Sequence, residues 1–216
     1  MEGASTYYTE GTSGYARGLM RMVETTPAEA GTDGAPKLRA DAARNRAKLV
    51  TTARDVFTAE GGQASLEQIA KAAEVGIGTL YRHFPTRLDL LEAVYRDEVD
   101  VLRETAEKVI PNHPPVEALE IWLAAFVEYA ATKRHIFTEL VEAVGRESEL
   151  MTHSRAVIYD NAEILVKRAQ DSGEIRTDVT SPDVLRLVGG CTMMPNFDHD
   201  QTERILRIVM DGLRTT

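Results

Sequence analysis

Apolar residues recur every three to four positions along most of the chain beyond residue 40, and this spacing is typical of amphipathic helices. The clearest case is the segment 119–130, whose apolar positions fall on one stripe of a helix. Those positions are Leu119, Trp122, Leu123, Phe126, Val127 and Ala130. The sequence has no clear run of alternating apolar and polar residues with turn signals at both ends. We therefore predict an all-α fold of about nine helices.

Start and stop signals give the bounds of the helices in the first part of the chain. A first helix is expected at about 41–60, and it should end at Gly61 and Gly62, because glycine is favoured just after a helix. Ser65 and Gln68 have the spacing of a capping box, in which each side chain binds the backbone N–H of the other residue. They predict the start of a short second helix.

A third short helix is predicted at about 77–83, and Pro85 marks its end. Thr86 can cap a fourth helix over 87–103, because a threonine hydroxyl accepts hydrogen bonds from the free N–H groups of a helix start. The residues that the third helix is expected to bury are Ile77, Leu80 and Phe84.

Proline interrupts the helical pattern after the fourth helix, at positions 111, 114 and 115. Beyond the helix at 119–130, the spacing predicts a helix around 136–144 and a longer one that ends near Gly173. Two more helices follow, at about 181–194 and 200–214. The last helix has an apolar stripe wider than one core needs, which indicates a surface for a partner.

Residues 1–36 differ in composition from the rest of the chain. They contain six Gly and six Thr, but among Val, Ile, Leu and Phe only Leu19 and Val23. Such a stretch buries too little apolar surface to offset the entropy that ordering costs, so we predict a flexible arm over residues 1–39. Two interpretations stay open: a genuine tail, or a start of translation at Met22, which would leave residues 1–21 outside the native protein.

The cysteine count and the apolar runs favour a cytoplasmic protein. Cys191 is the only cysteine, so no disulfide can form within the chain, as expected for a reducing compartment. The longest strongly apolar stretch, 121–127, is far shorter than the roughly 20 residues that span a membrane. Glu2 stands where an export signal carries basic residues. We therefore expect neither a membrane segment nor an export signal.

The net charge of −9, taken as an average, argues against a nucleic-acid binder. The charge is unevenly distributed along the chain, however. Residues 37–96 hold ten basic and seven acidic residues, whereas residues 97–216 carry a net charge of −9. Most of the excess positive charge lies between Lys37 and Arg54, where it can follow the phosphates of DNA. The acidic average therefore does not exclude a segment that binds DNA.

The segment 65–87, SLEQIAKAAEVGIGTLYRHFPTR, has the pattern of a helix-turn-helix. Two short helices flank a turn near 74–76, and a second helix of this kind enters the major groove of DNA. Gly78 keeps the outer surface of that helix low, and Thr79 can bind a phosphate or touch a thymine methyl group. Beyond the helix, Arg87 can reach a backbone phosphate. The polar side chains expected on the face opposite the core are Tyr81, Arg82 and His83.

Over residues 46–94, and most closely over GTLYRHFPTRLDLLEAV at 78–94, the sequence resembles the DNA-binding domain of tetracycline-repressor-like (TetR/AcrR-type) bacterial transcriptional regulators. The segment GEIRTDV at 173–179 is similar to the connector that precedes the last two helices in many members. The resemblance implies a helix-turn-helix DNA-binding domain over 40–86 and a ligand-binding, dimerising domain over 87–216.

By this resemblance the protein is a sequence-specific transcriptional regulator, most often a repressor, that leaves a palindromic operator when a small molecule fills a cavity. A homodimer through the last two helices is implied, with no metal and no cofactor. Glu149 and His153 have the spacing of two metal ligands on a helix, but no third ligand accompanies them. The expected DNA contacts are Arg46, Ser65, Gly78, Thr79, Tyr81, Arg82, His83 and Arg87. The residues expected to line the cavity are Trp122, Phe126, Tyr129, Phe137, Met151, Tyr159 and Met194.

Two other classes of function stay open at this point. A helix-turn-helix regulator that responds to a protein partner, without a small-molecule inducer, would have a filled core in place of a cavity. An all-α enzyme would need titratable groups that converge in a pocket. The sequence offers no catalytic residues for it, because neither a nucleophile with a matched base nor a phosphate-binding loop is present.

Overall fold

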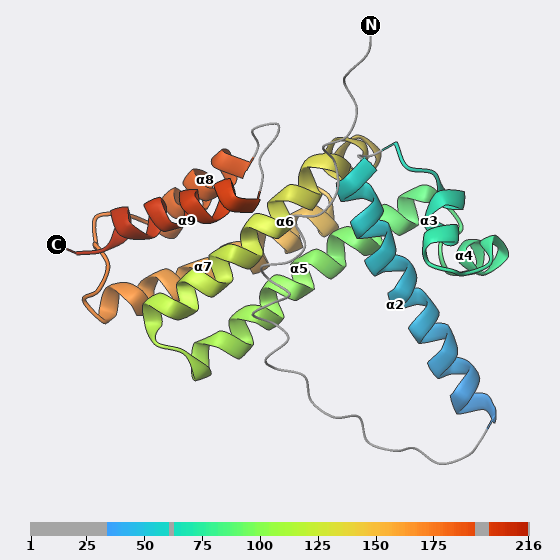
Figure 1. Cartoon of the computed structure of the whole chain (residues 1–216), viewed down its shortest axis with the longest axis horizontal. Coiled ribbons are helices and arrows are strands. Elements are labelled where there is room, and N and C mark those ends of the chain that lie inside the picture. The colour runs from blue at the N-terminus through green and yellow to red at the C-terminus, as the bar shows by residue number, and fades with distance from the viewer. Residues whose placement is uncertain (1–33, 61–62, 193–198, 216) are drawn as a thin grey trace, which may run out of the picture.

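The computed structural model describes residues 34–60, 63–192 and 199–215, and within these ranges the chain is a bundle of helices (Figure 1). The helices are α2 (Gly34–Glu60), α3 (Leu66–Ala72), α4 (Ile77–His83), α5 (Arg87–Asn112), α6 (Pro115–Val144), α7 (Glu149–Asp171), α8 (Ser181–Thr192) and α9 (His199–Leu213). Figure 1 shows α3 and α4 at one end of the molecule and α8 and α9 at the other. The all-α prediction is confirmed.

Helices α2, α3 and α4 form a small unit around one apolar core. The core side chains that are almost completely buried are Leu49, Ala53, Phe57, Ile69, Leu80 and Phe84. The predicted helix starts occur at both capping residues. Ser65 and Gln68 form the expected capping box of α3, and Thr86 forms a second one with Asp89 at the start of α5. Each box satisfies backbone N–H groups that a helix start leaves without partners.

Two details of this unit differ from the predictions. Helix α2 begins at Gly34, so it is longer than the predicted 41–60 and includes residues 34–39 of the predicted arm. Alanine, lysine, leucine and arginine in this segment are strong helix formers, which explains the extension. Ile77 is 40% exposed, because the turn residue Val75 packs against the core at this point and α4 buries only Leu80 within its seven residues. The predicted C-cap at Gly61 and Gly62 lies outside the described residues.

Helices α5 to α9 form the larger unit, with α6 at its centre in contact with α5, α7, α8 and α9. Two helices were predicted over 119–130 and 136–144, but α6 is one helix of 30 residues. Its continuity follows from the sequence between the two stripes, which contains neither proline nor glycine to stop the helix. Helix α6 begins with Pro115 in its first turn and ends at Gly145, whose φ of 85° lies in the left-handed region that favours glycine.

Helix α5 is also longer than predicted, because it passes through Pro111 and ends at Asn112. A proline so close to the end costs the helix one backbone hydrogen bond, and the chain reverses direction immediately afterwards. The segment resembling a family connector does lie before the last two helices, between Asp171 and Ser181. There Ile175 forms an isolated antiparallel bridge with Arg214, which holds the end of α9 against the end of α7. Within the described residues, no helix has the length and apolar character that crossing a membrane requires.

Candidate nucleic-acid interface and ligand cavity

The turn between α3 and α4 fixes the direction of α4. Glu74 adopts a φ of 52°, in the left-handed region, and Val75 donates a backbone hydrogen bond of 2.9 Å to Ala70. The Lys48 ammonium on α2 lies 2.9 Å from the Glu74 carboxylate. These contacts tie the turn to both preceding helices, so that α4 presents one defined face to the outside.

The outer face of α4 has no side chain at Gly78, near its start, and an exposed aromatic ring at Tyr81, in its middle. Gly78 is exposed, and a Cβ atom added there would meet nothing within 4 Å. Tyr81, one turn further, is 44% exposed, whereas Leu80 and Phe84 on the opposite face are buried. This arrangement places the predicted contacts Gly78 and Tyr81 on a surface that another molecule can approach closely.

Arg82 and Thr79 contact each other across one turn of α4. The Arg82 guanidinium donates to the Thr79 hydroxyl over 3.1 Å and to the Gly78 carbonyl over 3.3 Å. The Ser65 hydroxyl is also engaged, since it accepts from the backbone N–H of Gln68 in the capping box. The side chains of Thr79 and Arg82 therefore form a joint polar group beside Tyr81.

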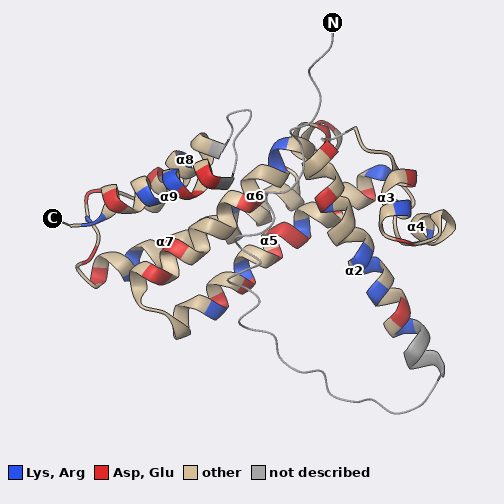
Figure 2. Cartoon of the chain, in the orientation of Figure 1, with Lys and Arg blue, Asp and Glu red and all other residues tan. Residues whose placement is uncertain are grey.

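Basic residues of α2 border this surface. Arg46 is exposed, and its guanidinium lies over the Phe84 ring, 5.2 Å from the ring centre, beside the half-buried His83. Arg44 and Lys48 are exposed on the same part of α2. Figure 2 shows basic residues on α2, α3 and α4. The predicted contacts Arg46, Ser65, Gly78, Thr79, Tyr81, Arg82 and His83 thus all belong to the small unit.

Arg87 has a different environment from the other predicted contacts. Its Nε lies 2.8 Å from the Glu139 carboxylate on α6, and another of its nitrogens donates to the Ala64 carbonyl. The guanidinium also lies 5.1 Å from the centre of the Phe57 ring. Arg87 therefore joins the small unit to α6. Its predicted phosphate contact stays a prediction, and it would require Arg87 to leave these partners.

A second ion pair, which sequence reasoning missed, crosses the same boundary. Glu98 on α5 is 7% exposed and lies 3.4 Å from the Arg54 guanidinium on α2. Burial raises the pKa of Glu98 to about 7, although the positive charge of Arg54 opposes this shift. Nearby, the hydroxyls of Thr58 on α2 and Thr132 on α6 are 3.4 Å apart. The small unit is thus attached to α5 and α6 by several polar contacts.

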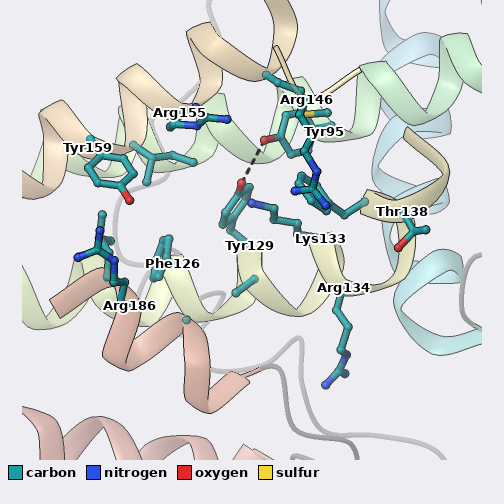
Figure 3. Close-up of a pocket in the computed structure, with 16 residues that line it drawn as sticks. Tyr95, Phe126, Tyr129, Lys133, Arg134, Thr138, Arg146, Arg155, Tyr159 and Arg186 are labelled. Atoms are coloured by element: carbon teal, nitrogen blue, oxygen red, sulfur yellow. Dashed lines mark hydrogen bonds between the residues drawn. The ribbon is translucent and has the colours of Figure 1, made fainter. Parts of the chain in front are cut away.

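A cavity of about 430 Å³ lies in the larger unit, between α5, α6, α7 and α8 (Figure 3). Its lining residues are Tyr95, Phe126, Tyr129, Ala130, Lys133, Arg134, Phe137, Thr138, Arg146, Met151, Arg155, Ile158, Tyr159, Leu185, Arg186 and Gly189. The volume is within the range of pockets that hold small organic molecules. Gly189 lies against the Phe126 ring, and a Cβ added there would make an ordinary van der Waals contact of 3.7 Å with it.

Five of the seven residues predicted for a cavity line this one: Phe126, Tyr129, Phe137, Met151 and Tyr159. Trp122 does not line it. Its side chain is completely buried in the core, where its Nε1 donates to the Leu102 carbonyl over 3.0 Å and its ring stacks behind Phe126. Met194 lies outside the described residues.

Basic residues and a tyrosine of the cavity were missed. Lys133 follows Tyr129 by four residues on the apolar stripe of α6, and this spacing was the signal available in the sequence. Its Nζ lies 4.3 Å from the centre of the Phe137 ring and 5.5 Å from that of Tyr129. Burial and the positive charges of Arg155 and Arg146 lower the pKa of Lys133 to about 8.

Two tyrosines form the wall of the cavity next to Lys133. The hydroxyls of Tyr95 on α5 and Tyr129 on α6 are 3.3 Å apart, as the dashed line in Figure 3 marks. Burial raises the pKa of Tyr129 well above its ordinary value, and the charge of Glu98 contributes to the same shift. The cavity wall is therefore electrostatically coupled to the ion pair that holds α2.

Metal ligands are not gathered anywhere in the described part of the chain, where no three His, Cys, Asp or Glu side chains form a group. Glu149 and His153, the pair with metal-ligand spacing, are both exposed on α7.

Both halves of the chain match families of known proteins. Residues 49–94 match the family described as "Bacterial regulatory proteins, tetR family", and residues 114–215 match "Transcriptional regulator SbtR-like, C-terminal domain". HTH-type transcriptional regulators of Staphylococcus aureus are 30% identical over 94 residues, which is 43% of this chain. The chain spans about half the length of these curated relatives, 51%.

Solved structures extend the similarity over most of the described chain. A TetR transcriptional regulator from Streptomyces coelicolor is 39% identical with a TM-score of 0.69, over 79% of this chain and 99% of that one. A TetR regulatory protein from Mycobacterium vanbaalenii is 34% identical with a TM-score of 0.64, over 82% of this chain and 99% of that one. Both similarities include the small unit and the larger unit together.

Proposed function

This chain belongs to the TetR family of bacterial transcriptional regulators, and we propose that it represses transcription from an operator that it leaves when a small molecule fills the cavity. One observation carries the proposal: a single stretch of α6 serves both sites. Lys133 and Phe137 line the cavity, while Thr132 and Glu139 on the same stretch contact the small unit. A ligand that moves this stretch acts directly on the contacts that hold the DNA-binding helices.

In this proposal α4 enters the major groove. Gly78 lets the helix approach the base edges, Tyr81 and the Thr79–Arg82 group contact the operator, and Arg46 with the neighbouring basic residues of α2 follows the phosphates. In the same complex, Ser65 and the start of α3 that it caps would lie near the phosphate backbone of the operator. Such a regulator acts where the chromosome is, in the bacterial cytoplasm.

Two copies of the chain bind one operator in this proposal. Leu187 on α8 is 52% exposed and Ile208 on α9 is 68% exposed, and these apolar side chains support a dimer through the last two helices. A twofold axis between the copies presents two α4 helices to successive major grooves, and their separation decides the affinity.

Release follows from a change in that separation. A ligand that binds better to a conformation with displaced α4 helices shifts the population toward it, by as much as the difference in the two affinities. The Arg87–Glu139 and Arg54–Glu98 pairs are the links through which α6 and α5 carry the small unit with them. DNA and ligand then oppose each other's binding to the same extent.

The test begins with selection of bound fragments from bacterial genomic DNA by the purified full chain. Selected fragments are titrated by mobility shift, and each is placed downstream of a promoter for transcription in vitro. We expect specific fragments, repression on addition of the protein, and a loss of affinity of about tenfold or more for Tyr81→Ala on every fragment, because a groove contact is removed.

Ile164→Ala is the matched control, since Ile164 is also an exposed large side chain, 49% exposed, but lies on α7. It should bind every fragment as the wild type does. Recovery of no enriched fragment, or equal binding by Tyr81→Ala and wild type, would contradict the proposed function.

A further inference from the structure

The charges around the cavity are opposite in sign to those of the unit that contains it. Residues 97–216 hold 13 basic and 22 acidic residues. Nevertheless the described cavity lining includes five basic residues and no acidic one. The five are Lys133, Arg134, Arg146, Arg155 and Arg186. The sign of this lining is therefore a property of the cavity rather than of the average composition.

Among the basic residues of the cavity, Lys133 is the one that a bound anion would stabilise most. Its ammonium lies against the rings of Phe137 and Tyr129, and within the described residues no carboxylate lies within 4 Å of it. The lowered pKa of about 8 still leaves most copies protonated at neutral pH. A half-buried cation whose neighbours Arg146 and Arg155 are also cations is stabilised by a bound anion.

Two of the other basic residues that line the cavity already have a carboxylate partner. Arg155 lies 3.9 Å from Glu147 and Arg186 lies 3.9 Å from Asp183, and all four side chains are largely exposed. Exposed pairs at this distance are weak and exchange readily for another anion. Figure 3 shows Arg134 directed away from Lys133 and Tyr129. The positive charges that act on Lys133 are those of Arg155 and Arg146, so these three residues form the positive end of the cavity.

The rest of the cavity is apolar. Phe126, Ile158 and Leu185 line it together with Met151, and Tyr159 is contributed by α7. Aromatic and aliphatic side chains of this kind bind the body of an organic molecule through buried area, while a few charged groups fix its orientation.

We propose that the cavity binds an amphipathic organic anion, with its acidic group at Lys133, Arg146 and Arg155 and its apolar body between Phe126, Ile158 and Leu185. This assignment rests on the proposed function, because it names the chemical class of the effector. The anion adds a charge partner to a helix whose next turn contacts the small unit, so binding and release act through the same part of α6.

A pair of dyes tests the charge requirement directly. 8-Anilinonaphthalene-1-sulfonate is an organic anion, and N-phenyl-1-naphthylamine has the same ring system without the sulfonate. Both increase in fluorescence in apolar sites, so each can be titrated into the full chain without DNA. We expect the anionic dye to bind at least about tenfold more tightly than the neutral dye, as one charge-assisted contact provides.

Variants then locate the site. Lys133→Met and Arg155→Met keep most of the side-chain length and remove the charge, and each should weaken the anionic dye about tenfold and change the neutral dye less than twofold. Arg103→Met, an exposed arginine on α5 outside the cavity, is the control and should change neither dye. Thermal unfolding of each variant checks that the fold is retained.

The proposal is overturned if the neutral dye binds as tightly as the anionic one, if the ratio of the two affinities is the same in wild type and both cavity variants, or if neither dye binds. These results involve no DNA. Failure of the proposed function is instead read from the operator selection, so the two failures are distinguishable.

Discussion

The proposed DNA-binding surface, formed by α4 with the neighbouring part of α2, and the cavity use basic residues in opposite ways. On the surface, Arg82 contacts Thr79 of its own helix, and Lys48 of α2 pairs with Glu74 in the turn before α4, so these exposed charges are held by neighbouring groups of the small unit. In the cavity, Lys133 points inward among aromatic rings, next to Arg146 and Arg155. The first arrangement suits a large polyanion that approaches from outside, and the second suits a single small anion that becomes enclosed.

The two sites also differ in how many parts of the chain they need. The surface is formed mainly by one segment, 65–84, with a contribution from α2. The cavity draws on α5, α6, α7 and α8, over residues 95–189. A site within one segment can be altered by one substitution without disturbing the rest, whereas a site between helices depends on their packing.

The largest expected effect is a loss of operator affinity in a variant that changes α4 and leaves the cavity intact. In Gly78→Asp, the new carboxylate fits sterically, because a Cβ at Gly78 meets nothing within 4 Å, but in the proposed complex it would face the phosphates and bases of the operator. Juxtaposed like charges cost several kcal/mol, so operator affinity should fall at least about 100-fold in mobility-shift titrations.

Gly78→Asn is the matched control, because it has nearly the same size without the charge, and its loss of affinity should be much smaller. Both variants should bind the anionic dye as the wild type does and unfold in urea within about 1 kcal/mol of it, since aspartate is tolerated in the first turn of a helix. Equal losses of operator affinity in the two variants would show that size, rather than charge, limits the approach.

The sequence predicts a site within one segment better than a site formed between several helices. The capping residues Ser65 and Thr86 and the bounds of α4 were predictable, because each depends on residues close in the chain. Phe126, Tyr129 and Phe137 were predictable as cavity candidates only from their type and spacing. Whether such a residue lines the cavity or fills the core depends on the packing of several helices, and neither the position of Trp122 in the core nor that of Lys133 at the cavity could be told from spacing alone.

The next largest effect is a pH dependence of stability that arises between the small and the larger unit, where Glu98 is buried beside Arg54. The folded pKa of about 7 is above the ordinary value of 4.5, so the group favours the folded state fully below pH 4.5 and loses this contribution as the pH rises through 7. We expect the free energy of unfolding of the wild type to fall between pH 5 and pH 8 by up to about 3 kcal/mol relative to Glu98→Gln, measured by urea denaturation.

Glu104→Gln provides the comparison on the same helix, because Glu104 is half exposed and pairs with Lys108 in the next turn. Its stability should follow the wild type across this pH range. The same pH slope in Glu98→Gln and wild type would mean that the pKa of Glu98 is not raised in the folded protein.

The smallest expected effect is a change in operator affinity when Arg87 is substituted. Arg87 lies between the DNA-binding helices and α6, so this variant tests how the two sites are linked. The sequence predicts a phosphate contact for Arg87, whereas in the structure it contacts Glu139 and Ala64. If it acts through the ion pair, Arg87→Met and Glu139→Gln each change operator affinity by about two- to fivefold, as expected for a partly exposed pair, and the double variant is no weaker than either single one.

The salt dependence of binding separates this outcome from a direct contact. Loss of a phosphate contact lowers the slope of log affinity against log salt concentration by about one, and it affects only the arginine variant. We expect the slope to be the same in wild type, Arg87→Met and Glu139→Gln, because none of these changes removes a group that touches DNA. A reduced slope in Arg87→Met alone would assign Arg87 to the DNA surface, and the link between the two regions would then depend on Arg54 and Glu98.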